Sequence, residues 1–224
     1  MTFSLIARCA QTGQFGMVIA SSSPAVAARC AHARAGVGVV ASQNITDPAL
    51  GPALLDLMER GMSADDALLT VANSHPHIAF RQLLIVDAQG RGGVLSGAHS
   101  LGIWKTERAE NVAAGGNLLA NNGIPAAMLA AYAAAAGSFG DRLMAALHGG
   151  LAAGGEAGPV HSAGMKIVDR LSWPIVDLRC DWTDDCPITA LQAAWDVYRP
   201  QMDAYVQRAE DPTVAPSYGV PGDE

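Results

Sequence analysis

The order of the predicted strands and helices constrains this chain more than any other sequence feature. Two apolar segments, 2–9 and 15–20, flank a turn at 11–14 and predict an antiparallel hairpin. Further along the chain, strands are again expected side by side, and helices follow one another in pairs. Consecutive hairpins and consecutive helices disfavour a parallel sheet built from strand–helix–strand units. The sequence therefore predicts an α+β fold in which two antiparallel sheets lie between helical layers.

Hydrophobic periodicity, together with Gly, Pro and capping residues, sets the expected boundaries of these elements. Strands are predicted at 2–9, 15–20, 35–41, 78–87, 93–97, 112–119, 160–169 and 175–180. Helices are predicted at 48–60 with Asp47 as N-cap, from Ser63 to about residue 74, at 124–136, at 139–147, and from Pro187 onward. Pro200 must bend or split the last helix. We expect one domain over residues 1–210 and an extended Pro- and Gly-rich tail over 211–224.

Composition and charge exclude several classes of function. The formal net charge is −7, with 14 basic and 21 acidic residues and no cluster of Lys or Arg, so nucleic-acid binding is not expected. No apolar run has membrane-spanning length, and the first residues lack the pattern of a signal peptide, so we expect a cytoplasmic protein without membrane contact. The four cysteines form no CxxC pair, so no metal site and no cofactor are predicted.

The start of the chain offers a candidate nucleophile. Thr2 follows Met1 directly and opens the first predicted strand. Threonine is small enough for methionine aminopeptidase to remove Met1, which would leave Thr2 with a free α-amino group. That residue would then carry a hydroxyl nucleophile and, beside it, an amine of near-neutral pKa that can act as its base. N-terminal-nucleophile (Ntn) hydrolases use this arrangement, although many chains begin with Met-Thr for no such reason.

Polar residues at the ends of other predicted strands are the next candidates. Ser21, Ser22 and Ser23 end the strand that pairs with Thr2, so their hydroxyls can reach its amine or hydroxyl; the alternative is a plain turn before Pro24. The run of Ser42, Gln43 and Asn44 ends the third strand and offers amides to a substrate. The alternative for these three residues is capping of the helix that follows.

A further polar pair of candidates lies in the second half of the chain. Asn117 follows Gly115 and Gly116 and is our oxyanion candidate, although a β-bulge with a satisfied Asn would look the same. His161 and Ser162 follow the Gly-rich loop 149–158, which suits a lid or a substrate loop. A solvated loop histidine is the alternative there.

Several segments together resemble a known family. The hairpin, AGVGVVASQ, ALGPALLDLMERG, QLLIVDAQGR and GGNLLAN occur in an order similar to that of the DUF1028 family, which is usually assigned to the Ntn-hydrolase superfamily. The resemblance runs from Thr2 to about Asp211. It implies a four-layer αββα sandwich and Thr2 as the nucleophile. A proteasome-like site would also need a lysine near the amine, but the only lysines, Lys105 and Lys166, do not end an early strand.

These observations predict an amidohydrolase that cleaves a linear or cyclic C–N amide bond in a small, polar, amino-acid-derived molecule. The alternative is a non-catalytic binding or assembly module on the same scaffold. We also expect a homodimer or larger homo-oligomer, because an almost all-Ala helix and a final helix that carries Trp195, Tyr198 and Tyr205 offer apolar surface. The competing explanation is that both helices cover the sheets of their own subunit.

Overall fold

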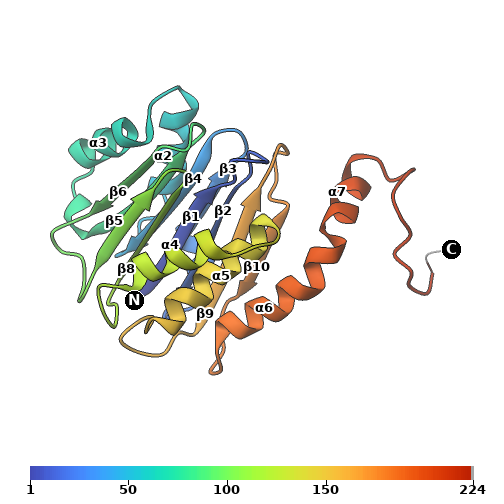
Figure 1. Ribbon diagram of the computed structural model, residues 1–224. Helices are drawn as coiled ribbons and strands as arrows, with labels where there is room; N and C mark the ends of the chain where they lie inside the picture. Colours follow the sequence, from blue (N-terminus) through green and yellow to red (C-terminus); the bar gives the residue numbers. More distant parts are fainter. Residues whose placement is uncertain (223–224) are drawn as a thin grey trace.

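Helices cover both outer faces of a pair of stacked antiparallel β-sheets (Figure 1). The computed structural model describes residues 1–222. A six-stranded sheet has the order β10-β9-β2-β1-β8-β7, and a four-stranded sheet has the order β3-β4-β5-β6. The predicted α+β fold, a four-layer sandwich with two antiparallel sheets between helical layers, is confirmed.

The six-stranded sheet places the first strand of the chain near its centre. Its strands are β1 (Thr2–Arg8), β2 (Phe15–Ser21), β7 (Lys105–Ala109), β8 (Val112–Asn117), β9 (Ser162–Val168) and β10 (Val176–Cys180). β1 pairs antiparallel with β2 along one edge and with β8 along the other. All of Thr2 to Ala7 is buried as a result. A central strand with both edges paired holds its first residue in a fixed position.

The four-stranded sheet is built from one continuous stretch of chain. Its strands are β3 (Ala31–Arg34), β4 (Gly38–Asn44), β5 (Arg81–Asp87) and β6 (Gly92–Ser96). The short helix α1 (Val26–Cys30) links the two sheets. Sequence analysis missed α1, β3 and β7, because α1 is only five residues long and the two strands are short and partly exposed, without clear hydrophobic alternation.

The helices form the two outer layers. They are α2 (Leu50–Glu59), α3 (Ala64–Ser74), α4 (Ile124–Ala134), α5 (Phe139–Ala152), α6 (Pro187–Tyr198) and α7 (Met202–Glu210), with short 3-10 turns at Ile78–Phe80 and Arg199–Gln201. Ser63 caps α3, as predicted, by accepting a hydrogen bond from the amide of Asp66. Pro200 splits the last helix as expected.

The predicted role of Asp47 as a helix N-cap is wrong. The helix begins at Leu50 with Ala49 as its N-cap. Asp47 instead accepts a hydrogen bond from the amide of Ala49 and a second one from the ring of His75. Asp47 therefore stabilises the loop before the helix. The preference of Pro for the first helical position had placed the start of this helix at Pro48, two residues too early.

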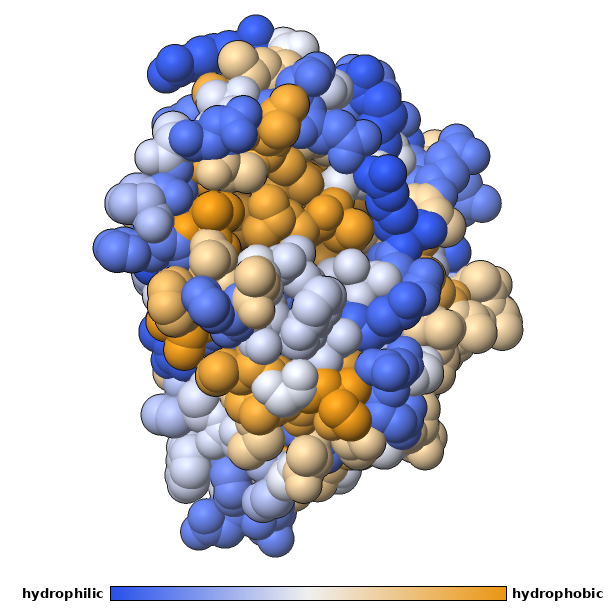
Figure 2. Space-filling model, turned by 90° about the vertical axis from the view of Figure 1, so that its left-hand side faces the viewer, coloured by the Kyte–Doolittle hydropathy of each residue, from blue (hydrophilic) through white to orange (hydrophobic). Residues whose placement is uncertain are grey.

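Three hydrophobic layers hold the sandwich together. One layer packs α4, α5 and α6 against the six-stranded sheet, one fills the space between the sheets, and one packs α2 and α3 against the four-stranded sheet. On the side of the molecule where β6 lies, hydrophobic residues form groups above and below a central region of intermediate hydropathy, and hydrophilic residues lie mostly at the edges (Figure 2). Within residues 1–222, no helix combines the length and apolar character needed to cross a membrane.

The last helices bear on the predicted interface. Trp195 is 1% exposed, packs into the core of its own chain and donates a hydrogen bond to Asp141, so the suggestion that it anchors a partner subunit is wrong. The Ala-rich helix α4 packs closely on α5, where a Cβ on Gly149 would lie 2.5 Å from that of Ala131. That close approach occurs within one subunit.

The final segment differs from the body in its packing. α7 contributes no buried residue and lies to one side of the sandwich (Figure 1). The following residues 211–222 contain no helix or strand, and they contact α7 through hydrogen bonds from Gln207 and Arg208. The tail expected over 211–224 is thus described up to residue 222, and its last two residues lie outside the described part.

Candidate active site

The N-terminal end of β1 is where polar residues from several strands meet. Because neighbouring strands run antiparallel, the start of β1 lies beside the ends of β2 and β8. Thr2 is opposite Asn117 in the pairing with β8, and Ser21, at the end of β2, is opposite Ser162 of β9. The predicted candidates Thr2, Ser21, Asn117 and Ser162 are therefore brought to one end of the six-stranded sheet.

A cluster of hydroxyl groups surrounds the first residues. Thr2 Oγ1 is 3.4 Å from Ser21 Oγ, and both hydroxyls donate to the carbonyl oxygen of Met1. Ser21 Oγ is also 2.9 Å from Ser23 Oγ and accepts a hydrogen bond of 3.1 Å from the amide of Ser23. The Thr2 side chain is almost buried, since the residue is 5% exposed. Loss of Met1 would leave the Thr2 amine beside the Ser21 hydroxyl.

Beneath this cluster, a chain of buried side-chain amides crosses the space between the sheets. Ser4 Oγ donates to Gln43 Oε1 at 2.7 Å, and Gln43 Nε2 donates to Gln82 Oε1 at 2.8 Å. The same Gln82 oxygen accepts from Asn117 Nδ2 at 3.1 Å. Gln82 Nε2 donates to the Gly116 carbonyl and to Ser96 Oγ. A buried network with these partners is rigid, so it fixes the strand ends on which Thr2 and Asn117 stand.

The sequence analysis did not identify Gln82 as a site residue. Gln82 is the second residue of β5, just ahead of an apolar run, and it shares a face with Leu84 and Val86, which fill the space between the sheets. The signal that the sequence offered was a single polar residue two positions before a buried one on the same strand face.

Asn117 occupies a buried position at 1% exposure. One of its two Nδ2 hydrogens is used by Gln82, which leaves the second for another acceptor. Packing explains why a glycine precedes Asn117. A Cβ on Gly116 would lie 2.8 Å from the Thr2 carbonyl oxygen and 2.5 Å from the Leu119 side chain. Gly116 therefore allows β8 to approach β1 closely.

Two further predicted candidates, Ser42 and Asn44, contact loop backbone near the end of β4. Ser42 faces away from the space between the sheets and donates to the Asp47 carbonyl. Asn44 lies at the rim with a φ of 75°, and its amide binds the Phe80 carbonyl and the Leu101 amide. Both residues thus help to hold loops, and neither caps the helix that follows, whose N-cap is Ala49.

Ser162 and His161 have mainly structural contacts. Ser162 Oγ donates to the Ser23 carbonyl at 2.6 Å and accepts from the Val26 amide at 3.2 Å, which holds the turn after β2. The ring of His161 stacks on Trp182 and is 2.8 Å from the Thr183 carbonyl. His161 is thus engaged with the loop after β10 and is not brought to Thr2.

Glu156 is a site residue that the sequence did not single out. It lies in the Gly-rich loop, is 5% exposed, and both carboxylate oxygens accept from the amide of Ser22, at 3.2 and 3.1 Å. Burial raises the pKa of Glu156 to about 7, although the positive N-terminal amine and the Ser22 contacts oppose the shift. A buried carboxyl that titrates near neutrality therefore lies close to the start of the chain.

A pocket of about 420 Å³ opens over Thr2. Its lining consists of Met1, Thr2, Ser23, Val26, Arg29, Cys30, Asn44, Ile45, Thr46, Pro48 and Leu101. Three of the four non-glycine residues with positive φ among the described residues lie around this end of the sheets, namely Ala25, Asn44 and Leu118. Such strained backbone is retained where surrounding structure enforces it, and it concentrates at functional sites.

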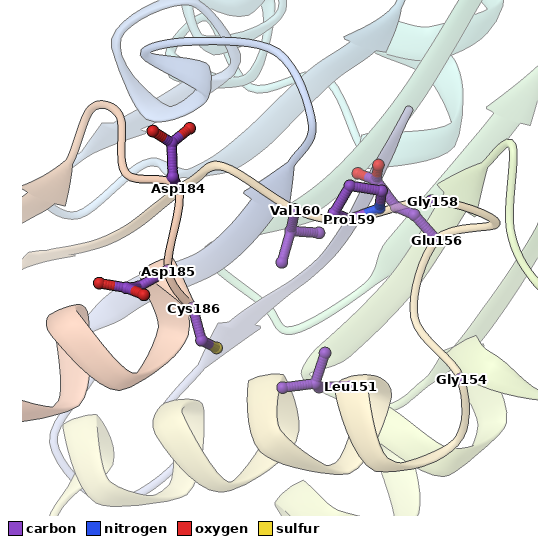
Figure 3. Close-up of a pocket in the computed structure, with 9 residues that line it drawn as sticks. All are labelled: Leu151, Gly154, Glu156, Gly158, Pro159, Val160, Asp184, Asp185 and Cys186. Atoms are coloured by element: carbon purple, nitrogen blue, oxygen red, sulfur yellow. The ribbon is translucent and has the colours of Figure 1, made fainter.

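A second cavity of about 320 Å³ lies on the other side of Glu156. Figure 3 shows that the side chains of Leu151 and Val160 point toward one another, whereas the carboxylate of Glu156 points away from them. Asp184 and Asp185 also turn away from Glu156. This cavity is therefore mainly apolar, without converging polar groups.

Neither lysine reaches the hydroxyl cluster. Lys166 contacts Asp177 and the Ala31 carbonyl, and Lys105 pairs with Glu107 at the sheet edge. Arg29 is the cation that lines the Thr2 pocket instead. Within residues 1–222, no group of three or more His, Cys, Asp or Glu residues is arranged to hold a metal ion.

The described fold has a counterpart among solved structures. The solved structure of protein SPO2555 from Silicibacter pomeroyi, which carries the DUF1028 family label, is 29% identical, covers 88% of each chain and superposes with a TM-score of 0.82. Anbu (ancestral beta-subunit) from Yersinia bercovieri is 11% identical over 91% of this chain and 97% of its own, and its TM-score of 0.40 is too low to support an argument about the site.

Sequence comparison gives the family directly. No protein with a curated function matches the chain. The sequence profile of DUF1028, described as a family of unknown function, matches residues 2–191 and so includes every strand of the two sheets and the first turn of α6. The chain therefore belongs to the DUF1028 family.

Proposed function

We propose that this protein is an amidohydrolase that uses Thr2, freed by removal of Met1, to cleave a C–N amide bond in a small amino-acid-derived molecule. One observation carries the proposal. The Thr2 hydroxyl stands between a buried polar network and an open pocket of about 420 Å³, beside the Ser21 hydroxyl. An N-terminal threonine held in this way combines a nucleophile and a base in one residue.

The reaction would proceed in two steps. The Thr2 oxygen attacks the substrate carbonyl carbon while its proton passes to the Thr2 amine; the amine then protonates the leaving nitrogen, and the C–N bond breaks. Water attacks the resulting ester, gives a proton to the amine and releases the acid, and the proton returns to the Thr2 oxygen. Each half-reaction restores the groups that the other one uses.

Neighbouring residues have supporting roles in this proposal. Ser21 and Ser23 orient the amine and the hydroxyl of Thr2 through their own hydroxyls. The remaining Nδ2 hydrogen of Asn117 stabilises the negative oxygen of the tetrahedral intermediate. Gln82 holds Asn117 in place.

The decisive experiment compares the wild type with Thr2→Ala and Thr2→Ser. A β-lactone probe should label the wild type on Thr2, as peptide mapping would show, and Thr2→Ala should lose both labelling and turnover with a nearly unchanged thermal midpoint. Thr2→Ser keeps a hydroxyl and should retain part of the activity. Full labelling of Thr2→Ala would end the proposal.

If Met1 is retained, a second function applies, a binding module without catalysis. The carbonyl oxygen of Met1 accepts from both the Thr2 and the Ser21 hydroxyl, so with Met1 in place neither group faces a free amine. Intact mass of protein from the native host separates the two functions. A mass that includes Met1 rules out the mechanism above.

A further inference from the structure

We propose that the pocket over Thr2 takes an amide that also carries a carboxylate, and that Arg29 binds this carboxylate. The inference deepens the proposed function, on which it rests for the reacting amide, by naming the charge and polarity of the substrate. Its central claim concerns binding and can be tested without turnover.

The charge of the pocket is the first argument. Arg29 is the one charged side chain in the lining, and no Asp or Glu faces it there. Arg29 also forms no ion pair with any residue between 1 and 222. A half-buried guanidinium without a counter-ion favours an anionic ligand.

The hydrogen bonds of Arg29 leave one edge of the guanidinium available. Nη1 donates to the carbonyls of Pro24 and Ala25, and Nη2 donates to Ser23 Oγ at 3.2 Å. Nε has no acceptor within the described part of the chain. The edge formed by Nε and Nη2 is the geometry that a carboxylate binds with two parallel hydrogen bonds. Because the Nη1 contacts already fix the side chain, little entropy is lost on binding.

The distance from Arg29 to Thr2 limits the length of the ligand. Three successive contacts join them: Thr2 to Ser21 at 3.4 Å, Ser21 to Ser23 at 2.9 Å, and Ser23 to Arg29 at 3.2 Å. A molecule that places its carbonyl at Thr2 and its carboxylate at Arg29 is therefore short. N-acyl amino acids, in which only the amide nitrogen and one carbon separate the carbonyl from the carboxylate, are molecules of this short kind.

The remaining lining favours an apolar side chain on the ligand. Val26, Cys30, Ile45, Pro48 and Leu101 contribute apolar surface to the pocket. Ile45 and Leu101 are 46% and 42% exposed, which leaves apolar surface beside Thr2 that a ligand can cover. The ligand class is thus an N-acylated amino acid with an apolar side chain.

The test measures binding to Thr2→Ala, in which alanine still permits loss of Met1 and turnover is prevented. Calorimetry would use N-acetyl-L-alanine, N-acetyl-L-valine, N-acetyl-L-leucine and N-acetyl-L-phenylalanine, each beside its uncharged C-terminal amide. At least one acid should bind about tenfold or more tightly than its amide, as expected for a charge-assisted pair. Adding Arg29→Gln should remove this preference, and adding Lys105→Gln, which lies at the sheet edge, should not.

Three results would overturn the inference: no acid of the panel binds, the amides bind as tightly as the acids, or the preference survives Arg29→Gln in a protein with unchanged thermal midpoint. If Arg29→Gln fails to fold, Arg29→Lys keeps the charge without the two-bond edge and should bind the acids more weakly. Acid binding by a wild type that never turns over would contradict the proposed function and leave this inference intact. Turnover of the neutral amides by the wild type with the same KM as the acids would support the proposed function and contradict this inference.

Discussion

The two ends of the space between the sheets are built differently. At the end away from Thr2, Ile6, Phe15, Met17 and Val39 pack as a continuous apolar layer. At the Thr2 end, the same layer consists of Ser4, Gln43, Gln82 and Asn117, which are equally buried but hydrogen-bonded to one another. Apolar burial stabilises the fold but does not fix the orientation of individual side chains, whereas a fully hydrogen-bonded polar network fixes the position of each side chain in it. The polar end therefore gives up hydrophobic burial for positioning.

The largest expected effect tests the polar end. Asn117→Ala should lower kcat by roughly 10²–10³ if this amide supplies one oxyanion donor. The variant also leaves the Gln82 oxygen with one donor fewer. Steady-state kinetics decides the role, because a change confined to KM would place Asn117 in substrate binding instead.

The apolar end should respond in the opposite way. Ile6 faces the same space as Thr2 and Ser4, further along β1, and it is fully buried. Ile6→Ala should cost about 3 kcal/mol of unfolding free energy through lost burial and a cavity, with kcat little changed in the folded protein. Urea denaturation and kinetics on the same sample measure both. An equal loss of kcat in Ile6→Ala and Asn117→Ala would erase the distinction between the two ends.

Glu156 gives a pH-dependent test at the border of the polar end. Its pKa is about 7 in the folded protein against 4.5 ordinarily, so the folded state binds the proton more tightly. Its contribution to stability is therefore fully present below pH 4.5 and is lost as the pH rises to about 7. Glu156→Gln should remove this decline, which amounts to at most about 3 kcal/mol, and be more stable than the wild type above pH 7.

Urea denaturation of both proteins at pH 5 and pH 8 checks this expectation. Gln can still accept from the Ser22 amide, so the loop contact is kept. A wild type that gains stability over this range relative to Glu156→Gln would reverse the sign and show that the carboxylate form is the favoured one.

The smallest effect concerns a region outside both ends. A chain that stops before Asp211 should keep the thermal midpoint of the body, because residues 211–222 contain no helix or strand and hydrogen-bond to α7, which itself contributes no buried residue. If the protein forms the homodimer that we propose and the tail reaches the partner, light scattering should show weaker association. A clear drop in the midpoint would instead make the tail part of the folded core.

Sequence patterns predicted the fold better than the site. Alternation and caps located eight of the strands, because apolar residues in β1, β2, β4 and β5 are dictated by burial in the layers. The edge strands β3 and β7 were not predicted, because partly exposed strands need no apolar pattern. At the site, Thr2, Ser21 and Asn117 could be proposed from strand ends alone.

The rest of the site depends on contacts between distant segments. Gln82 and Glu156 act through pairings with Asn117 and Ser22 that no local pattern records. Arg29 lies on a helix of five residues that carries no periodic signal. His161 had the residue type of a catalytic group, yet its ring stacks on Trp182, and only the folded chain shows which way it turns.

One sheet is formed by a continuous chain segment and the other by segments far apart in the sequence, and this difference affects when Met1 can be removed. The four-stranded sheet needs only residues 31–96, whereas the six-stranded sheet cannot be complete until β9 and β10 have been synthesised, up to Cys180. β1 can pair early with β2 in their hairpin, but its other edge waits for β8, and such long-range strand pairing is slow. In the finished sheet, Met1 is half-buried and its carbonyl is held by two hydroxyls. If Thr2 is the nucleophile that we propose, an aminopeptidase should therefore have its best access to Met1 before the sheet is complete, and folding and processing would compete.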